Sequence, residues 1–484
     1  MNNLIELTNI SKKFQGGSGS KMVLQDINLT IKSGEFVVLR GRNGSGKTTL
    51  LKIILGLLNP TYGEAKLMGN NANFSESKLQ VGVVLQETQV PRKLKVRELV
   101  ELFHSYYSSP LSVEEALGRV KLLYKQDSFT TDLSGGQKQR LLFALALVGD
   151  PKFLILDEPT RNLDDEGYEE FWEQIQSLKE NGVAILMVTN NQADWEKLEH
   201  LANRFINLKP FQENSEGPQI EERLISQTLE VKSIDFENIN FPSRQKLLLA
   251  QIKSEVLQIK RTPLYLLIFV FPIMIYILGN ELMGVTKWVA IYIAAAMLIA
   301  FSLESLTGRI ASERSGGWLN LIQATPLPPV AYIGSKIIIS LSICLSAVIL
   351  LLASISIKSS DISFSLNEFI GLTLAFGIVA IPILAFSLTL SYLINPESSS
   401  TVSGFSMLGV VLTAGAFPLS QSEWVQNLTA LSPVYHAHMF LLWSANLLDD
   451  DYSYAVLNFI WIVWASIAFF TLAVWAYRRD SVTQ

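Results

Sequence analysis

Hydrophobic and polar residues are distributed differently in the two halves of the chain. In the first 210 residues, short apolar runs are separated by longer stretches with helical spacing. Four of these runs are continuous rather than alternating, as in strands that are buried on both faces of a sheet. They are Phe36–Arg40, Val81–Leu85, Phe153–Leu156 and Ala184–Val188. Polar or glycine-containing residues follow each run, where an α/β domain places its ligand. The pattern predicts an α/β domain over residues 1–210.

Long apolar stretches occupy residues 263–484 instead. A helix needs about 20 apolar residues to cross a bilayer. Six stretches approach that length: Pro263–Leu282, Trp288–Thr307, Val330–Ile355, Glu368–Leu393, Thr401–Phe417 and Tyr454–Tyr477. Basic residues gather before the first stretch, between the second and third, and after the sixth. We therefore expect an all-α domain of six spans, with these three ends in the cytoplasm beside the α/β domain.

Two shorter segments connect these halves. Residues 211–244 are rich in Glu, Asn, Ser and Gln, and this composition predicts a linker or a poorly packed end of the soluble domain. Residues 245–262 place Leu248, Ile252 and Val256 at helical spacing, with Lys246 and Lys253 on the other face. Their position just before a span favours an interfacial helix on the cytoplasmic leaflet. A soluble amphipathic helix packed on the α/β domain is the alternative.

Composition sharpens this division. Hydrophobic residues make up 49% of the chain and charged residues 17%, but only 23 of the 239 residues from Lys246 onward are charged. This excludes a purely cytosolic protein. The net charge is −5 and no basic stripe is visible, so we expect no nucleic-acid partner. The first residues, MNNLIELTNI, lack the features of a signal peptide, and we expect the α/β domain to stay in the cytoplasm.

The strongest motif follows the strand FVVLR and matches the phosphate-loop pattern at every fixed position. It runs through Gly41, Arg42, Asn43, Gly44, Ser45, Gly46, Lys47, Thr48 and Thr49. Glycines let backbone N–H groups turn toward phosphate oxygens, and the following helix adds its positive end. Lys47 is expected to reach the β- and γ-phosphates, and the Thr48 hydroxyl to ligate Mg²⁺.

A pair of acidic residues ends the run Phe153–Leu156. Asp157 is placed to hold Mg²⁺ through water, and Glu158 to act as general base on the attacking water. Paired acids at a strand end can also cap a helix, but the phosphate loop upstream favours the catalytic interpretation.

The segment LSGGQKQR, from Leu133 to Arg140, resembles the signature of the ATP-binding cassette (ABC) superfamily. The resemblance covers residues 1 to about 210 and implies an ABC-type P-loop ATPase that binds ATP and Mg²⁺. It also implies that the signature acts in trans, on nucleotide bound by a second ATPase domain. The signature residues concerned are Ser134, Gly135, Gly136 and Gln137.

Other positions match the family order and take their roles from it. Phe14 stands where an aromatic stacks on adenine, and Gln86 where a glutamine senses Mg²⁺ and touches the transmembrane partner. Asp164 matches the acidic loop that crosses between two sites. Asn190 stands where the family usually carries a histidine that contacts the γ-phosphate. An amide can donate to phosphate but cannot titrate, so we expect slow hydrolysis rather than a dead site.

The segment from Gly308 to Pro329 resembles the cytoplasmic segment of the ABC-2 exporter membrane family. An acidic–basic pair, glycines and a Thr-Pro-Leu step precede the third span there. The resemblance implies a coupling helix that docks near Gln86. An ordinary loop between two spans remains the alternative.

These features predict an exporter half-transporter, similar in domain order to subfamily G. A homodimer would complete two ATP sites and surround a path for an unidentified substrate across the plasma membrane. The compact loops suit a bacterial membrane. A mechanotransmission protein that works on the cell envelope, and a sensor or regulator that binds ATP with little transport, are the alternatives.

Overall fold

The structure is a computed structural model that describes residues 3–16, 19–86, 88–212, 219–225, 240–262, 287–358, 364–394, 432–448 and 452–483, with a few isolated residues between them. The chain divides into two compact units. Unit 1 comprises residues 1–257, 316–332 and 481–484, and unit 2 comprises residues 258–315 and 333–480. The segment 316–332, which lies between two predicted spans, thus folds with unit 1.

The described part of unit 1 contains two sheets. A four-stranded antiparallel sheet has the order β2-β1-β4-β5, and a six-stranded sheet has the order β10-β9-β3-β8-β7-β6. In the second sheet β9, β3, β8, β7 and β6 pair in parallel, and β10 is an antiparallel edge strand. The strands are β1 (Asn3–Gly16), β2 (Gly19–Lys32), β3 (Phe36–Arg40), β4 (Tyr62–Leu67), β5 (Asn70–Asn71), β6 (Val81–Val84), β7 (Phe153–Asp157), β8 (Ala184–Val188), β9 (Arg204–Leu208) and β10 (Ile220–Leu224).

The four predicted central strands are β3, β6, β7 and β8, within one residue of their expected ends. Nearly all their residues are buried, which accounts for the continuous apolar runs. β10 lies inside the predicted linker and extends the sheet beyond residue 210. Its residues are mostly exposed, as befits an edge strand, so a hydrophobicity pattern could not reveal it.

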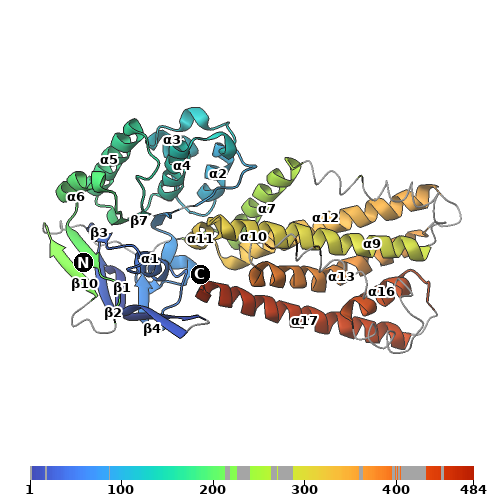
Figure 1. Ribbon diagram of the computed structural model, residues 1–484. Helices are drawn as coiled ribbons and strands as arrows, with labels where there is room; N and C mark the ends of the chain where they lie inside the picture. The colour runs from blue at the N-terminus through green and yellow to red at the C-terminus, as the bar shows by residue number, and fades with distance from the viewer. Residues whose placement is uncertain are drawn as a thin grey trace. The chain divides into compact units, whose positions relative to one another are not determined.

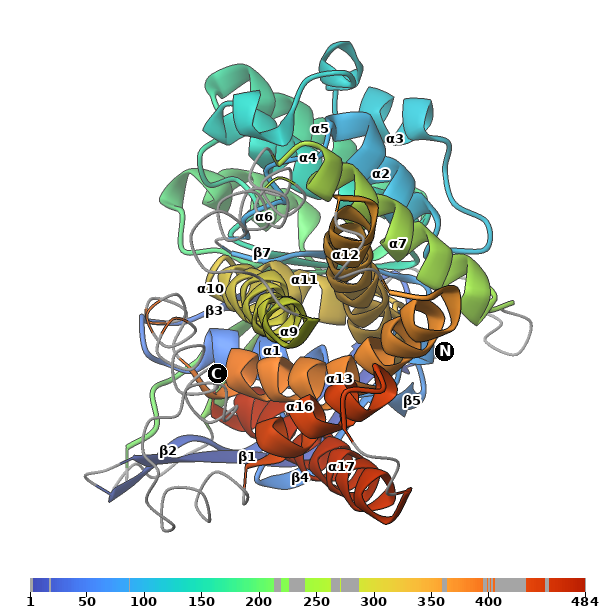
Figure 2. The ribbon, with the colours of Figure 1, turned by 90° about the vertical axis from the view of Figure 1, so that its right-hand side faces the viewer.

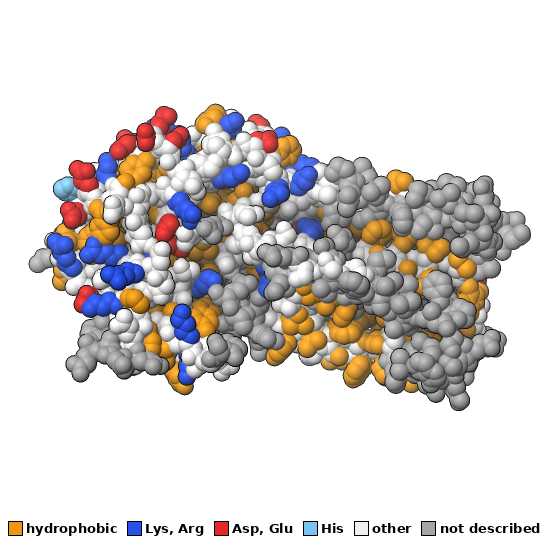
Figure 3. All heavy atoms as spheres, in the orientation of Figure 1, with side chains coloured by type: hydrophobic (Ala, Val, Ile, Leu, Met, Phe, Trp, Pro, Cys, Tyr) orange, Lys and Arg blue, Asp and Glu red, His pale blue; other side chains and the backbone are white. Residues whose placement is uncertain are grey.

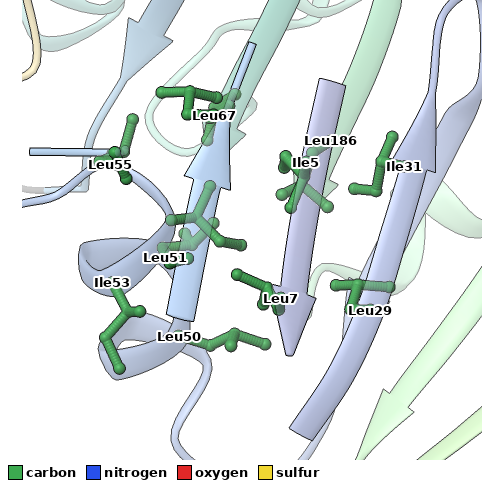
Figure 4. Packing of buried hydrophobic residues seen from close by; sticks show 14 of the residues in the cluster. Ile5, Leu7, Leu29, Ile31, Leu50, Leu51, Ile53, Leu55, Leu67 and Leu186 are labelled. Atoms are coloured by element: carbon green, nitrogen blue, oxygen red, sulfur yellow. The ribbon is translucent and has the colours of Figure 1, made fainter. Parts of the chain in front are cut away.

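Unit 1 also contains helices, most of which gather on one side of the sheets (Figure 1). They are α1 (Lys47–Ile54), α2 (Val96–His104), α3 (Val113–Arg119), α4 (Gly135–Leu147), α5 (Asp165–Glu180), α6 (Trp195–Leu201), α7 (Arg244–Lys260) and the short α11 (Trp318–Gln323). Figure 4 shows part of the core, where Leu50 and Leu51 of α1 pack with Ile5 and Leu7 of β1 and with Leu186 of β8. This packing holds α1, and therefore the loop before it, against both sheets.

Unit 2 is helical in the part that the structure describes. Its elements are α9 (Lys287–Ser302), a π-helical turn at Leu303–Gly308, α10 (Arg309–Ser315), α12 (Pro329–Lys358, whose first turn belongs to unit 1), α13 (Leu366–Leu393), α16 (Pro433–Ser444) and α17 (Tyr452–Thr483). Figure 1 shows α9, α12 and α17 running in roughly the same direction, and Figure 2 views α9 and α12 from their ends.

Among the residues that the structure describes, four helices are long and apolar enough to cross a membrane. They cover Lys287–Ser315, Pro329–Ser354, Leu366–Leu393 and Ser453–Tyr477, and correspond to the second, third, fourth and sixth predicted spans. The predicted spans Pro263–Leu282 and Thr401–Phe417 lie outside the described residues, apart from isolated positions. Large apolar side chains such as Ile460, Trp464 and Ile467 of α17 are exposed, and Figure 3 shows hydrophobic side chains over the visible face of unit 2. Such a surface suits hydrocarbon rather than water.

Candidate active site

The phosphate loop joins β3 to α1. Its members Gly41, Asn43, Gly44, Ser45 and Gly46 precede the helix, and Lys47, Thr48 and Thr49 form its first turn. Gly44 and Gly46 have φ angles of 81° and 100°, which residues with a side chain rarely adopt. A Cβ on Gly46 would also lie 2.9 Å from Leu24 Cδ2. The glycines are therefore required by the backbone path around the loop.

Two polar groups of this loop point to an anionic ligand. Lys47 Nζ donates to the carbonyl oxygens of Gly41 (2.6 Å) and Arg42 (3.3 Å). Burial lowers the pKa of Lys47, while the carboxylates of Glu158 and Asp157 act to raise it. The Ser45 hydroxyl is buried and has no hydrogen-bond partner among the described residues. A phosphate in the loop would offer both groups a charged acceptor.

Asp157 and Glu158 stand at the carboxyl end of β7, as predicted. Asp157 is buried, and this burial, followed by the charge of Glu158, raises the pKa of the Asp157 carboxyl to about 6. Lys47 and a backbone N–H of Gln86 act in the opposite direction. Glu158 has a φ of 47°, and its N–H donates to the Val188 carbonyl of β8 at 2.8 Å. Strained backbone of this kind is typical of functional sites.

Gln86 and Asn190 are far apart in the sequence, but both lie near the carboxyl end of β7. Gln86 follows β6, and its Nε2 donates to Glu158 Oε2 at 3.1 Å. Asn190 follows β8, and its exposed Nδ2 donates to Asn43 Oδ1 of the phosphate loop at 3.5 Å. The structure thus brings the predicted base, the predicted Mg²⁺ sensor and the predicted phosphate contact together at the carboxyl ends of the parallel strands.

Phe14 lies on β1 of the antiparallel sheet and is half-buried. Lys12, two residues earlier on the same face of the strand, places its Nζ 5.1 Å from the centre of the Phe14 ring. The same Nζ donates to the Asn59 carbonyl at 2.8 Å. Lys12 therefore supports one side of the aromatic ring. This lysine was not among the predicted site residues, although its i, i+2 spacing from Phe14 is visible in the sequence.

The signature begins α4. Ser134 Oγ accepts from the Gln137 N–H at 3.2 Å, and Gln137 Oε1 accepts from the Ser134 N–H at 3.0 Å, so the two residues form a capping box. Gly135 is the first helical residue, and a Cβ on Gly136 would lie 3.1 Å from the Asn162 carbonyl oxygen. Among the described residues, no hydrogen bond joins this signature to the phosphate loop. Within one chain, the signature and the phosphate loop therefore belong to separate sites.

Asp164 begins α5 and is linked to the signature helix. Its Oδ1 accepts from the Gly167 N–H at 3.1 Å and from Arg140 Nη2 at 3.2 Å. These two bonds lower the pKa of Asp164, the Gly167 N–H first. Arg140 also pairs with Glu170 at 3.0 Å. Arg140 was not predicted to have a role of its own, because the sequence does not show that α4 and α5 meet here.

Comparison with known proteins decides the family. A sequence profile described as ABC transporter matches residues 24–161. The chain is also 31% identical, over 263 residues, to "Nod factor export ATP-binding protein I" of Rhizobium johnstonii, and this match covers 52% of the chain and 82% of the relative. The chain belongs to the ABC transporter family. The predicted ABC-type ATPase domain is thereby confirmed.

Other relatives of the ABC transporter differ in coverage. The protein of the same name from Burkholderia lata is 37% identical over 201 residues, covering 40% of the chain and 65% of the relative. "Macrolide export ATP-binding/permease protein MacB" of Chlorobium phaeobacteroides is 39% identical over 202 residues, covering 39% of the chain and 31% of the relative. The chain therefore spans less than two thirds of the length of both these relatives.

Among solved structures, the chain is similar to the dimeric ATP-binding cassette MJ0796 bound to ADP and Pi. The identity is 28% and the TM-score is 0.41, with 46% of the chain and 99% of the cassette covered.

Proposed function

We propose that the ABC transporter is an exporter of the ABC-2 type, which works as a homodimer in a bacterial plasma membrane with its ATPase domain in the cytoplasm. The observation that carries the proposal is the segment 316–332. It connects two candidate spans in the sequence, yet it folds with the ATPase in unit 1. A segment shared in this way can transmit movement between ATP hydrolysis and the spans.

The contacts of this segment are specific. The Gly316 carbonyl accepts from the Gln89 N–H at 2.7 Å, close in sequence to Gln86. The Trp318 ring is buried, and its centre lies 5.9 Å from that of Phe103 on α2. Lys78 Nζ, also buried, donates to the Gln323 carbonyl at the end of α11 at 2.6 Å. These contacts support the role of α11 as the predicted coupling helix.

The helix α7 also contacts the ATPase domain. Its Gln251 Nε2 donates to the Tyr106 hydroxyl, and its Lys253 pairs with Glu101 at 3.2 Å. Leu249 is exposed. The contacts agree with the alternative of a helix packed on the ATPase, and an exposed leucine beside cationic residues is compatible with a leaflet surface. The interfacial location stays a prediction.

The roles in hydrolysis follow from the site. Glu158 acts as general base on the attacking water, Gln86 orients Glu158 through its 3.1 Å bond, and Asn190 donates to the γ-phosphate. A bound Mg²⁺ would neutralise phosphate charge. The Thr48 hydroxyl and the Asp157 carboxylate offer the oxygen ligands that Mg²⁺ prefers. Among the described residues, no group of three or more His, Cys, Asp and Glu could hold a metal alone, which suits an ion shared with nucleotide phosphates.

A homodimer is proposed because the signature is separate from the phosphate loop in one chain. Ser134 and Gly136 stand at the N-terminus of α4, where backbone N–H groups can bind a phosphate. A second copy related by a two-fold axis would place each signature over the other copy's nucleotide. The link between Arg140 and Asp164 would then hold the two trans-acting segments together.

The experiment uses inside-out membrane vesicles that contain the full chain. Vesicles with the wild-type protein or with Glu158→Gln are incubated with a metabolite extract and ATP, and their contents are compared by mass spectrometry. An exporter accumulates at least one compound in the wild-type vesicles only. Equal contents despite normal phosphate release would refute export and favour the mechanotransmission alternative. Equal contents without phosphate release would favour an ATP-binding sensor. This is the second candidate, because asparagine stands at position 190 in place of the family's usual histidine.

A further inference from the structure

Asp194 is a fully buried carboxylate next to the hydrolysis site. Its Oδ2 accepts from two hydroxyl groups, Thr160 Oγ1 at 3.0 Å and Thr189 Oγ1 at 2.6 Å. Asp194 precedes α6, but its side chain does not cap that helix. Burying a carboxylate is unfavourable unless hydrogen bonds compensate. The carboxylate is therefore directed at the two threonines rather than at its own helix.

The two threonines lie on the loops that carry the proposed catalytic groups. Thr160 is two residues beyond Glu158, and Thr189 directly precedes Asn190. These loops leave the neighbouring parallel strands β7 and β8, in which Asp157 is paired with Val188. A single carboxylate thus joins the loop of the proposed base to the loop of the proposed phosphate contact.

Asn191, which follows Asn190, is hydrogen-bonded to the same Asp194 carboxylate. Asn191 Nδ2 donates to Asp194 Oδ1 at 3.4 Å, and the Asn191 N–H donates to Thr189 Oγ1 at 3.1 Å. Thr189 and Asn191, the two neighbours of Asn190, are therefore both held by hydrogen bonds to the Asp194 carboxylate. The Asn190 side chain itself is exposed and directed to Asn43 of the phosphate loop.

We propose that Asp194 is a positioning residue for ATP hydrolysis, which holds residues 189–191 so that the Asn190 amide faces the phosphate loop. Asp194 is fully buried, so it acts through Asn190 rather than by touching the nucleotide itself. The proposal rests on the role of Asn190 proposed above.

The first test is Asp194→Asn in the full chain. The new NH₂ group faces either the two threonine hydroxyls, both of which already accept from Asn191, or the NH₂ group of Asn191. At least one bond to the carboxylate is lost, and we expect kcat to fall by about tenfold or more. The KM for ATP should change by less than about twofold, because ground-state binding is retained. Glu196→Gln, the same change at an exposed position of α6, should leave both constants unchanged.

The deciding test combines Asp194→Asn with Asn190→Ala. If Asp194 acts through Asn190, the double variant should have the kcat of Asn190→Ala alone. A kcat reduced by the product of the two single effects would show a general structural role and overturn the proposal. A normal kcat for Asp194→Asn beside a lowered one for Asn190→Ala would overturn the role of Asp194 alone. A normal kcat for Asn190→Ala would overturn the role of Asn190, and the route from Asp194 with it.

A second pair of variants applies if Asp194→Asn does not fold. Thr189→Val keeps the shape of the side chain and removes the donor, whereas Thr189→Ser keeps the donor. We expect a lowered kcat for valine and a nearly normal one for serine. Equal kcat values for these two variants would overturn the proposal.

Discussion

At the scale of residues, the two carboxyl groups at the end of β7 have different surroundings. Asp157 is buried, whereas Glu158 has a strained backbone and a side-chain bond to Gln86. The difference fits two tasks, since a metal ligand needs a fixed location and a base needs access to water. It also means that the two groups should respond differently to substitution.

Glu158→Gln should abolish steady-state hydrolysis and leave ATP binding intact. The change removes the base and retains Asp157 and the phosphate loop, and a base of this kind contributes about 10²–10⁴-fold to the rate. Phosphate release and binding of a fluorescent ATP analogue measure the two properties. Glu173→Gln, at an exposed position of α5, is the matched control. Undiminished turnover in Glu158→Gln would refute the assignment of the base.

Asn190→His should raise kcat and barely change the affinity for ATP. The imidazole restores the usual group of the family, and one oriented donor is worth at most about 10²–10³-fold in kcat. Asn190→Ala should lower kcat further. Steady-state phosphate release over a range of ATP concentrations measures both effects. If alanine were as active as asparagine, the position would have no part in the chemistry.

The raised pKa of Asp157 predicts how stability depends on pH. The folded carboxyl has a pKa of about 6, above the ordinary value of 3.8, so the folded protein binds this proton more tightly than the unfolded chain does. The contribution of Asp157 to stability is therefore lost as pH rises from about 4 to about 6. Asp157→Asn removes the ionisation, and the variant should be more stable than the wild type above pH 6, by an amount on the order of 2–3 kcal/mol.

Thermal unfolding of the nucleotide-free, metal-free protein in detergent measures this effect. The difference in Tm between Asp157→Asn and the wild type should shrink as the pH is lowered toward 4. Asp127→Asn, at an exposed position, should follow the wild type at each pH. A pH-independent difference for Asp157→Asn would contradict the prediction.

At the scale of elements, α11 is the short helix on which the proposed coupling depends. Trp318 is its first residue, and the buried ring packs on Phe103. Trp318→Ala should cost about 3–5 kcal/mol of packing. Because the phosphate loop lies on other elements, we expect phosphate release to persist while ATP-dependent accumulation in vesicles is lost. Val330→Ala, at an exposed position of the segment 316–332, should retain both phosphate release and accumulation in vesicles. Loss of both activities in Trp318→Ala, without loss of folding, would argue against a separate coupling role.

At the scale of the whole molecule, the separation of signature and phosphate loop predicts complementation between two copies. A Lys47→Ala chain and a Ser134→Arg chain are each expected to be inactive. A heterodimer of the two has one site built from intact halves and one that carries both changes. Some phosphate release should return in purified heterodimers, which two different affinity tags can isolate. No recovery would count against sites shared between copies, unless the two sites hydrolyse ATP only together.

Much of unit 1 was predictable because its signals are local. β3, β7 and β8 are buried on both faces, so their residues form continuous apolar runs that are visible without the fold. The phosphate loop needs glycine at positive φ, and the signature caps its own helix through residues three apart. In each case the cause lies within a few residues, where backbone torsion or a helix end limits the choice of side chain.

Other features were decided only by tertiary structure. Gln86 and Glu158 are 72 residues apart, and Thr160 and Asp194 are 34 apart, so their hydrogen bonds depend on which strands become neighbours in the sheet. Strand β10 is polar and exposed, and only pairing with β9 makes it a strand. The burial of Trp318 depends on Phe103, which is more than 200 residues away. Thus the sequence by itself determined the phosphate loop, the signature and the central strands β3, β7 and β8, because local backbone geometry and burial on both faces govern them. Only the packing of distant segments decided what Asp194 and Trp318 contact, because long-range burial has no local pattern.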